Sequence, residues 1–159
     1  MTLIDSHCHL ADPTFAADLD AVAARAREAG IAAALCILSA DEPDEIARVA
    51  AIRAAWPDVQ FSAGVHPHRA NAYAGRAADA IAVVEDTIAR VDACAVGEIG
   101  LDYHYDVGPK AVQREVFAAQ VGVAIARALP VVIHTREATD DTLAVLRDAG
   151  PAVRGVMHC

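Results

Sequence analysis

Short apolar runs alternate with helical patterns along the whole chain, and this alternation restricts the fold more than any other feature of the sequence. Residues 31–38 are almost wholly apolar, as in a strand that is covered on both faces. Residues 18–29 before them have the spacing of an amphipathic helix, and Gly30 follows at the position where helices commonly end. Repeated units of this kind predict an α/β protein with a parallel sheet.

The same pattern predicts where the elements lie. Strands are expected at residues 3–9, 31–38, 59–65, 93–98, 131–134 and 153–158. Helices are expected at residues 18–29, 41–55, 76–90, 111–128 and 139–149, with longer loops at 66–75 and 100–109. No linker interrupts the series, so residues 1–159 are expected to form a single domain.

The end of the first predicted strand separates two parallel-sheet architectures. A doubly wound open sheet normally has a glycine-rich phosphate loop at this point. Here the strand ends in His7-Cys8-His9, which favours a TIM-barrel-type (β/α)8 fold. The 159 residues are fewer than the roughly 250 of a complete barrel, so about six of the eight βα units are expected.

Polar side chains stand at the ends of several predicted strands, where barrel enzymes build their active sites. His7 and His9 are two residues apart, so on a strand they point the same way and Cys8 faces the opposite side. Two imidazoles placed in this way can chelate one metal ion. Exposed loop histidines would give the same short pattern, so the pair is weak evidence by itself.

Glu98, His134 and His158 each end an apolar run in the same manner. Gly97 and Gly100 near Glu98 permit close approach of a ligand or of backbone. Each residue alone could be a satisfied polar group at the edge of the core. Together they supply nitrogen and carboxylate ligands for divalent metal ions: His7, His9, Glu98, His134 and His158.

The composition of this set also bears on the metal. A carboxylate amid four histidines suggests that Glu98 bridges two ions, as in two-metal phosphoesterases. The expected cofactors are therefore two divalent metal ions, zinc, manganese or magnesium. Histidine-rich ligation favours zinc or manganese over magnesium.

The charge of the chain limits its nucleic-acid chemistry. The net charge is −9, whereas extended nucleic-acid-binding surfaces are usually basic. This balance disfavours a non-specific duplex binder. It is compatible with an enzyme that holds one phosphate through metal ions, because bound cations dominate the local charge of a site.

Location and cysteine chemistry are expected to be those of a cytoplasmic protein. The first ten residues lack the basic region and the long apolar core of a signal peptide, and no apolar run has the length of a membrane span. The four cysteines are scattered, so free thiols are expected rather than disulfides: Cys8, Cys36, Cys94 and Cys159.

Six segments of the chain resemble the TatD family of metal-dependent hydrolases and follow the order of the family. They are residues 4–10, 64–68, 97–103, 113–117, 132–136 and 155–159. The resemblance implies a hydrolase that cleaves phosphodiester bonds with metal-activated water. It points to a deoxyribonuclease of the 3′-exonuclease type, acting on DNA or on a small phosphodiester or ester substrate.

The resemblance also implies roles for individual residues. It places one metal on His7, His9 and Glu98 and a second on Glu98, His134 and His158, which makes Glu98 a catalytic residue as well. His66, His68 and Arg136 are implied to contact substrate phosphate, although surface histidines in a proline-rigidified loop and a capping or surface arginine fit those positions too. Asp102, Tyr103 and His104 are expected to lie in a loop that shapes substrate access or forms a structural turn.

The family pattern continues beyond the segments that match, to a last strand that ends in a Thr-Asp pair. Its aspartate ligates the first metal and serves as acid and base, and this sequence does not contain it. Six strands cannot close an eight-stranded barrel, so the chain made alone is expected to hydrolyse poorly. Two alternatives remain open: a hydrolase of another ester, such as an aminoacyl ester or a lactone, and a truncated non-catalytic remnant.

Overall fold

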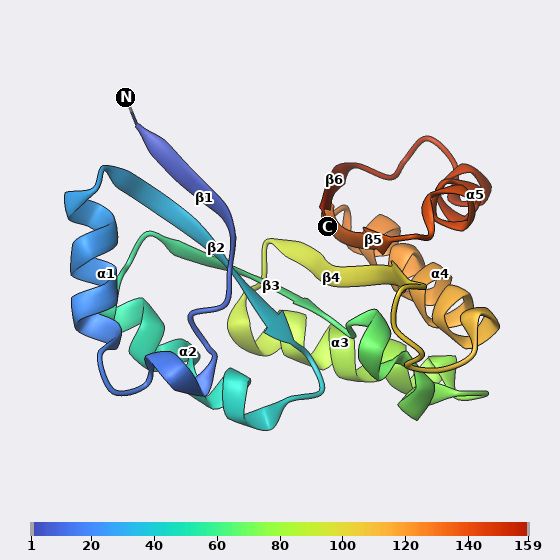
Figure 1. Cartoon of the computed structure of the whole chain (residues 1–159), viewed down its shortest axis with the longest axis horizontal. Coiled ribbons are helices and arrows are strands. Elements are labelled where there is room, and N and C mark those ends of the chain that lie inside the picture. Colours follow the sequence, from blue (N-terminus) through green and yellow to red (C-terminus); the bar gives the residue numbers. More distant parts are fainter. Residues whose placement is uncertain (1, 159) are drawn as a thin grey trace.

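The computed structural model describes residues 2–158, and its six strands form one parallel sheet (Figure 1). Consecutive strands are neighbours throughout, so the first and the last strand form the two edges. This order and the alternating helices confirm the predicted α/β architecture of an incomplete (β/α) barrel. The strands are β1 (Leu3–Cys8), β2 (Ile31–Ser39), β3 (Val59–Gly64), β4 (Ala95–Asp102), β5 (Val131–Arg136) and β6 (Gly155–His158).

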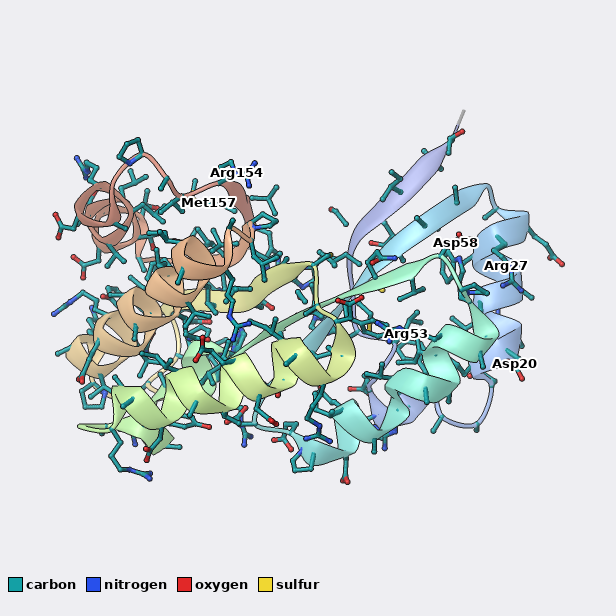
Figure 2. All side chains as sticks on the ribbon, turned by 180° about the vertical axis from the view of Figure 1, so that it is seen from behind. Asp20, Arg27, Arg53, Asp58, Arg154 and Met157 are labelled. Atoms are coloured by element: carbon teal, nitrogen blue, oxygen red, sulfur yellow. The ribbon has the colours of Figure 1, made fainter. Side chains whose placement is uncertain are left out.

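Helices follow the strands as the sequence pattern predicts. They are α1 (Leu19–Glu28), α2 (Pro43–Ala55), α3 (Ala77–Val91), α4 (Lys110–Arg127) and α5 (Thr139–Ala149), with short 3₁₀ helices η1 (Pro13–Phe15) and η2 (Pro67–Tyr73). Helix α3 packs between α2 and α4, and these three helices cover the outer face of the sheet (Figure 2). The site described below lies at the carboxyl ends of the strands.

The core lies between the sheet and the helices. Phe61 of β3, Ile99 of β4 and Phe117 of α4 are completely buried. All eight residues of β4 are buried, as in a strand that is covered on both faces, and they include the carboxylates of Glu98 and Asp102. Burial of such side chains is the main source of stability in a fold of this kind.

Two glycines let β4 and β5 lie close together beside Glu98. A Cβ atom at Gly97 would lie 2.6 Å from the Cβ atom of Val132. Gly100 has a φ of 139°, and a Cβ atom there would overlap the carbonyl oxygen of His134. The close approach that the sequence suggested is therefore made by the neighbouring strand.

The predicted end of the fourth strand was wrong. The strand was expected to stop at Glu98, with a loop from Gly100, but β4 continues to Asp102 and pairs with β5 along this length. The extension is stable because Ile99 and Leu101 are completely buried. β5 likewise extends to Arg136, beyond its predicted end at His134.

The loop predicted at residues 66–75 contains η2. Pro67 occupies its first turn, where the missing backbone donor costs nothing, and His66 caps its start. The loop therefore holds His66 and His68 on ordered backbone.

Two expectations about the whole chain can be compared with the described residues. Over residues 2–158, no helix combines the length and the apolar character that crossing a membrane requires. Cys8, Cys36 and Cys94 are free thiols, and Cys159 lies outside the described residues.

Candidate metal centre

The carboxyl ends of the strands surround a cavity of about 330 Å³. All six strands contribute residues to its lining, directly or through the segment that follows the strand. Every site residue predicted from the sequence lines this cavity: His7, His9, His66, His68, Glu98, His134, Arg136 and His158.

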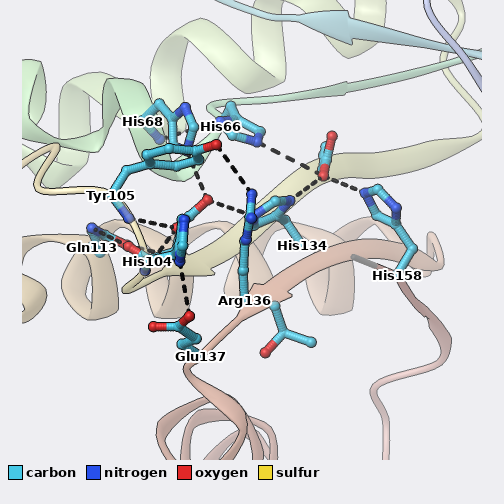
Figure 3. Close-up of polar contacts among 12 residues, drawn as sticks. His66, His68, His104, Tyr105, Gln113, His134, Arg136, Glu137 and His158 are labelled. Carbon is cyan, nitrogen blue, oxygen red and sulfur yellow. Dashed lines mark hydrogen bonds and ion pairs between the residues drawn. The ribbon is translucent and has the colours of Figure 1, made fainter.

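Glu98 contacts three of the four histidines that were predicted as metal ligands with it, and Figure 3 shows two of them, His134 and His158, in the site. Its Oε1 atom is 2.8 Å from Nδ1 of His134 and 2.5 Å from Nε2 of His158. Its Oε2 atom is 3.5 Å from Nε2 of His7, which in turn is 3.2 Å from Nε2 of His9. The fold therefore brings the five side chains together, and their role as ligands stays a prediction.

The environment of Glu98 keeps it ionised. The side chain is only 6% exposed, and this burial raises its pKa. The contacts with His134 and His158 outweigh the burial and bring the pKa to about 2. Burial lowers the pKa of His7, against the attraction of Glu98. An ionised carboxylate beside a neutral imidazole, as in Glu98 and His7, is the state in which both can donate electron pairs to a cation.

The donor set fits a divalent metal ion. One ligand atom from each of His7, Glu98 and His158 lies within 4.8 Å of the other two. The rings of His7 and His158 are only 4.0 Å apart, and Nδ1 of His7 is buried without a hydrogen-bond partner among the described residues. Nitrogen and oxygen donors crowded in this way are typical of zinc and manganese sites.

A second group of imidazoles lies beside the first. One ring nitrogen from each of His66, His68 and His134 lies within 4.8 Å of the others. Nε2 of His66 is also 3.8 Å from Oε1 of Glu98. Burial lowers the pKa of His66 to about 4, so this imidazole is neutral at pH 7.

Asp102 was expected in a loop, but the structure places it in β4 and beside two histidines of the cavity. It ends β4, is only 1% exposed, and its Oδ2 atom lies 2.8 Å from Nε2 of His68 and 3.0 Å from Nε2 of His134. Burial raises its pKa, but the hydrogen bond with His68, helped by the others, brings it to about 2. The alternation of Ile99 and Leu101 with Gly100 and Asp102 was the signal that the strand continues.

The residues that follow Asp102 make contacts with the segment after β5 and with Arg136. Arg136 lies over the ring of Tyr105 at 5.0 Å, so its guanidinium is held at the mouth of the cavity. Nδ1 of His104 is 2.8 Å from Oε1 of Glu137. The hydroxyl of Tyr103 donates to Asp141 instead, which favours the structural alternative for Tyr103.

Comparison with known families agrees with this geometry. A sequence model of the family described as TatD related DNase matches residues 4–159. The chain belongs to this family. Membership confirms the resemblance seen in the sequence.

Two curated relatives show how much of a TatD related protein is present. The uncharacterized metal-dependent hydrolase YabD of Bacillus subtilis (strain 168) is 34% identical over 165 residues, which cover 99% of this chain and 60% of YabD. The 3′-5′ ssDNA/RNA exonuclease TatD of Dickeya dadantii is 34% identical over 161 residues, which cover 99% of this chain and 58% of that protein. The chain thus spans about 60% of the length of these relatives.

Solved structures of TatD proteins have the same fold. The TatD homologue YJJV of Escherichia coli K12 matches with a TM-score of 0.77 and 27% identity, over 92% of this chain and 56% of that one. A TatD family hydrolase of Entamoeba histolytica matches with a TM-score of 0.79 and 22% identity, over 100% of this chain and 58% of that one. The sheet described above is therefore the TIM-barrel-type sheet of this family.

Proposed function

We propose that this protein is a divalent-metal-dependent hydrolase that cleaves phosphodiester bonds of single-stranded nucleic acid from the 3′ end. The observation that carries the proposal is the convergence of the imidazoles of His7, His134 and His158 on the buried carboxylate of Glu98, with His9 beside His7. His7, His9 and Glu98 would hold one ion, and Glu98, His134 and His158 a second. The donor set favours zinc or manganese, with magnesium as the third candidate.

The ions, when bound, would activate a water molecule for attack on phosphorus and would stabilise the developing negative charge. Nδ1 of His66 accepts the backbone N–H of His68 at 3.2 Å, so the neutral imidazole carries its proton on Nε2. This proton points toward the side of the cavity that holds Glu98. His66 is therefore suited to donate a hydrogen bond to a phosphate oxygen.

Arg136 and His68 complete the proposed phosphate contacts. A guanidinium can donate two parallel hydrogen bonds to a phosphate, and Arg136 is positioned for this by its contact with Tyr105. His68 lines the same cavity. With a net charge of −9 the chain repels a polyanion at long range, so local cations and donors must provide the attraction.

The names of relatives support nucleic acid as the substrate, because one relative is a 3′-5′ ssDNA/RNA exonuclease. Another is named only as a metal-dependent hydrolase. Hydrolysis of an aminoacyl ester or a lactone is therefore the competing outcome in the experiment that follows.

The experiment measures hydrolysis of single-stranded oligonucleotides with free or blocked 3′ ends, in the presence of manganese, zinc or magnesium. We expect slow, metal-dependent release of nucleotides, from free 3′ ends only. Glu98→Gln should reduce the rate by about 100-fold or more, above the 10–100-fold typical when an outer partner of a metal ligand is lost. Glu85→Gln is the matched control, because Glu85 pairs with Arg127 on the outer helices.

Equal rates for Glu98→Gln and wild type would contradict the assignment of the site. Turnover of aminoacyl esters or lactones without any cleavage of oligonucleotides would replace the proposed substrate and keep the metal centre. Absence of all hydrolysis despite bound metal would favour a non-catalytic protein.

A further inference from the structure

The carboxylate of Asp102 contacts two imidazoles of the site and no metal-ligand carboxylate. We infer that Asp102 is a positioning residue that keeps a proton on Nε2 of His134 and so directs Nδ1 of this histidine to the metal centre. The inference rests on the proposed function, because it takes His134 as a metal ligand. It gives Asp102 a role different from the loop position that the sequence suggested.

Each oxygen of Asp102 has a separate task. Oδ1 accepts the backbone N–H groups of His104 and Tyr105 at 3.0 Å and 3.2 Å. Oδ2 therefore remains for the imidazoles of His68 and His134, whose Nε2 atoms lie 2.8 Å and 3.0 Å away. A carboxylate only accepts hydrogen bonds, so both Nε2 atoms must carry protons to make these contacts.

His134 is held between two carboxylates. Its Nε2 atom faces Asp102, and its Nδ1 atom lies 2.8 Å from Glu98. Where a cation is shared with Glu98, His134 must offer a lone pair on Nδ1, since the ligand form of histidine is the neutral one. The single remaining proton then stays on Nε2, where Asp102 accepts it. Carboxylates commonly fix metal-binding histidines in this way.

Helix α4 fixes the position of Asp102 from behind. The side chain of Gln113 accepts the backbone N–H of Asp102 at 2.9 Å and donates to its carbonyl at 3.0 Å. Gln120, seven residues farther along α4, makes the same pair of bonds to Val65 at 2.7 Å and 3.1 Å. Both glutamines are buried. They hold the ends of β3 and β4, and with them His66 and Asp102, at a fixed separation.

The same oxygen of Asp102 links the two sides of the site. His68 is a proposed phosphate contact, whereas His134 is a proposed metal ligand, and both contact Oδ2. The neighbouring group of His66, His68 and His134 is therefore organised by a carboxylate, and it needs no further cation to hold it together.

Replacement of Asp102 by asparagine tests this assignment. The two backbone N–H groups require an acceptor at the position of Oδ1, so the amide oxygen of Asp102→Asn would lie there. Its NH₂ group would then face both imidazoles and donate to them. Nε2 of His134 would have to accept, its proton would move to Nδ1, and Nδ1 could no longer bind a metal ion.

The measurement uses the zinc-loaded protein, because zinc is diamagnetic and permits ¹⁵N NMR of the imidazole rings. In the wild type we expect His134 to be protonated on Nε2 and bound to zinc through Nδ1. In Asp102→Asn we expect the proton on Nδ1, and a calorimetric zinc titration should show an affinity about 10–100-fold lower for one ion. Asp141→Asn is the matched control, because Asp141 also accepts side-chain hydrogen bonds but none from an imidazole.

Two outcomes would overturn the inference: an unprotonated Nε2 on His134 in the zinc-loaded wild type, or unchanged protonation and zinc affinity in Asp102→Asn. If Asp102→Asn does not fold, the wild-type measurement decides alone. Zinc binding with the expected protonation but without nuclease activity would refute the proposed function and leave this inference standing. Absence of zinc binding by the wild type would contradict both.

Discussion

The central strand β4 and the edge strands β1 and β6 contribute to the same site from different environments. All eight residues of β4 are buried, whereas none of residues 3–8 or 155–158 is. Ile4 on β1 is 70% exposed. β4 carries the carboxylates Glu98 and Asp102, and the edges carry the imidazoles of His7 and His158.

This difference determines how firmly each proposed ligand is held in position. The carboxylates are fixed by packing on both faces of a strand that has partners on both sides. The edge imidazoles depend on strands that pair on one side only. The geometry of a metal site that uses all of them is therefore limited by the edges, and the following predictions compare the two regions.

The largest expected contrast is in stability. Ile99→Ala on β4 removes a completely buried side chain, which should lower the free energy of unfolding by about 2–5 kcal/mol. Met157→Ala on β6 removes a side chain that is 54% exposed, so its effect should stay within about 0.5 kcal/mol. Urea denaturation of both variants measures the contrast. Similar losses for the two variants would show that the edge is packed in solution.

The next effect concerns the contact between β4 and β5. Gly100→Ala should destabilise the protein by about 1–3 kcal/mol, because its positive φ and the carbonyl of His134 leave no room for a Cβ atom. Gly122→Ala in α4 is the control, since no atom outside its own stretch of helix backbone lies within 4 Å of the added Cβ atom and alanine favours a helix. In thermal denaturation the midpoint should fall for Gly100→Ala and rise slightly for Gly122→Ala. Equal midpoints for the two variants would refute the close contact.

A smaller effect should distinguish the two ions as the pH falls. Burial lowers the pKa of His7, whereas that of His134 is raised because Glu98 and Asp102 outweigh its burial. Protonation competes with metal binding and begins at higher pH for the group with the higher pKa. The ion held by His134 should therefore weaken first, by about tenfold per pH unit below the pKa of that imidazole. Zinc titrations at several pH values measure this order, and simultaneous loss of both ions would contradict it.

The smallest effect is expected at Cys8, between two proposed ligands. Its thiol lies 3.5 Å from the carbonyl of Leu35 on β2 and packs against the core, whereas His7 and His9 line the cavity. Cys8→Ala should leave the zinc affinity unchanged within error, in contrast to His7→Ala, which should lower it. Loss of zinc by Cys8→Ala with the fold intact would show that the ligands of β1 are assigned to the wrong face.

Most of the fold could be predicted because strand and helix patterns are local. Six strands, five helices and their order follow from apolar runs that alternate with helical spacing. The end of β4 was missed because Gly100 resembles the start of a loop. In the structure Gly100 lies within β4. The close approach of β5 leaves no room at this position for a larger side chain.

The sequence by itself determined which residues stand at the ends of the strands, because a parallel sheet places all carboxyl ends on one side. His7, His9, Glu98, His134 and His158 could be named for that reason, although β4 and β5 continue a few residues beyond Glu98 and His134. Only the tertiary structure decided how they meet. The contact between His158 and Glu98 joins residues 60 positions apart, and it depends on the curvature and pairing of the sheet. Asp102, Gln113 and Gln120 gained their roles in the same way, because the partners of a buried polar group are set by packing, which no local pattern records.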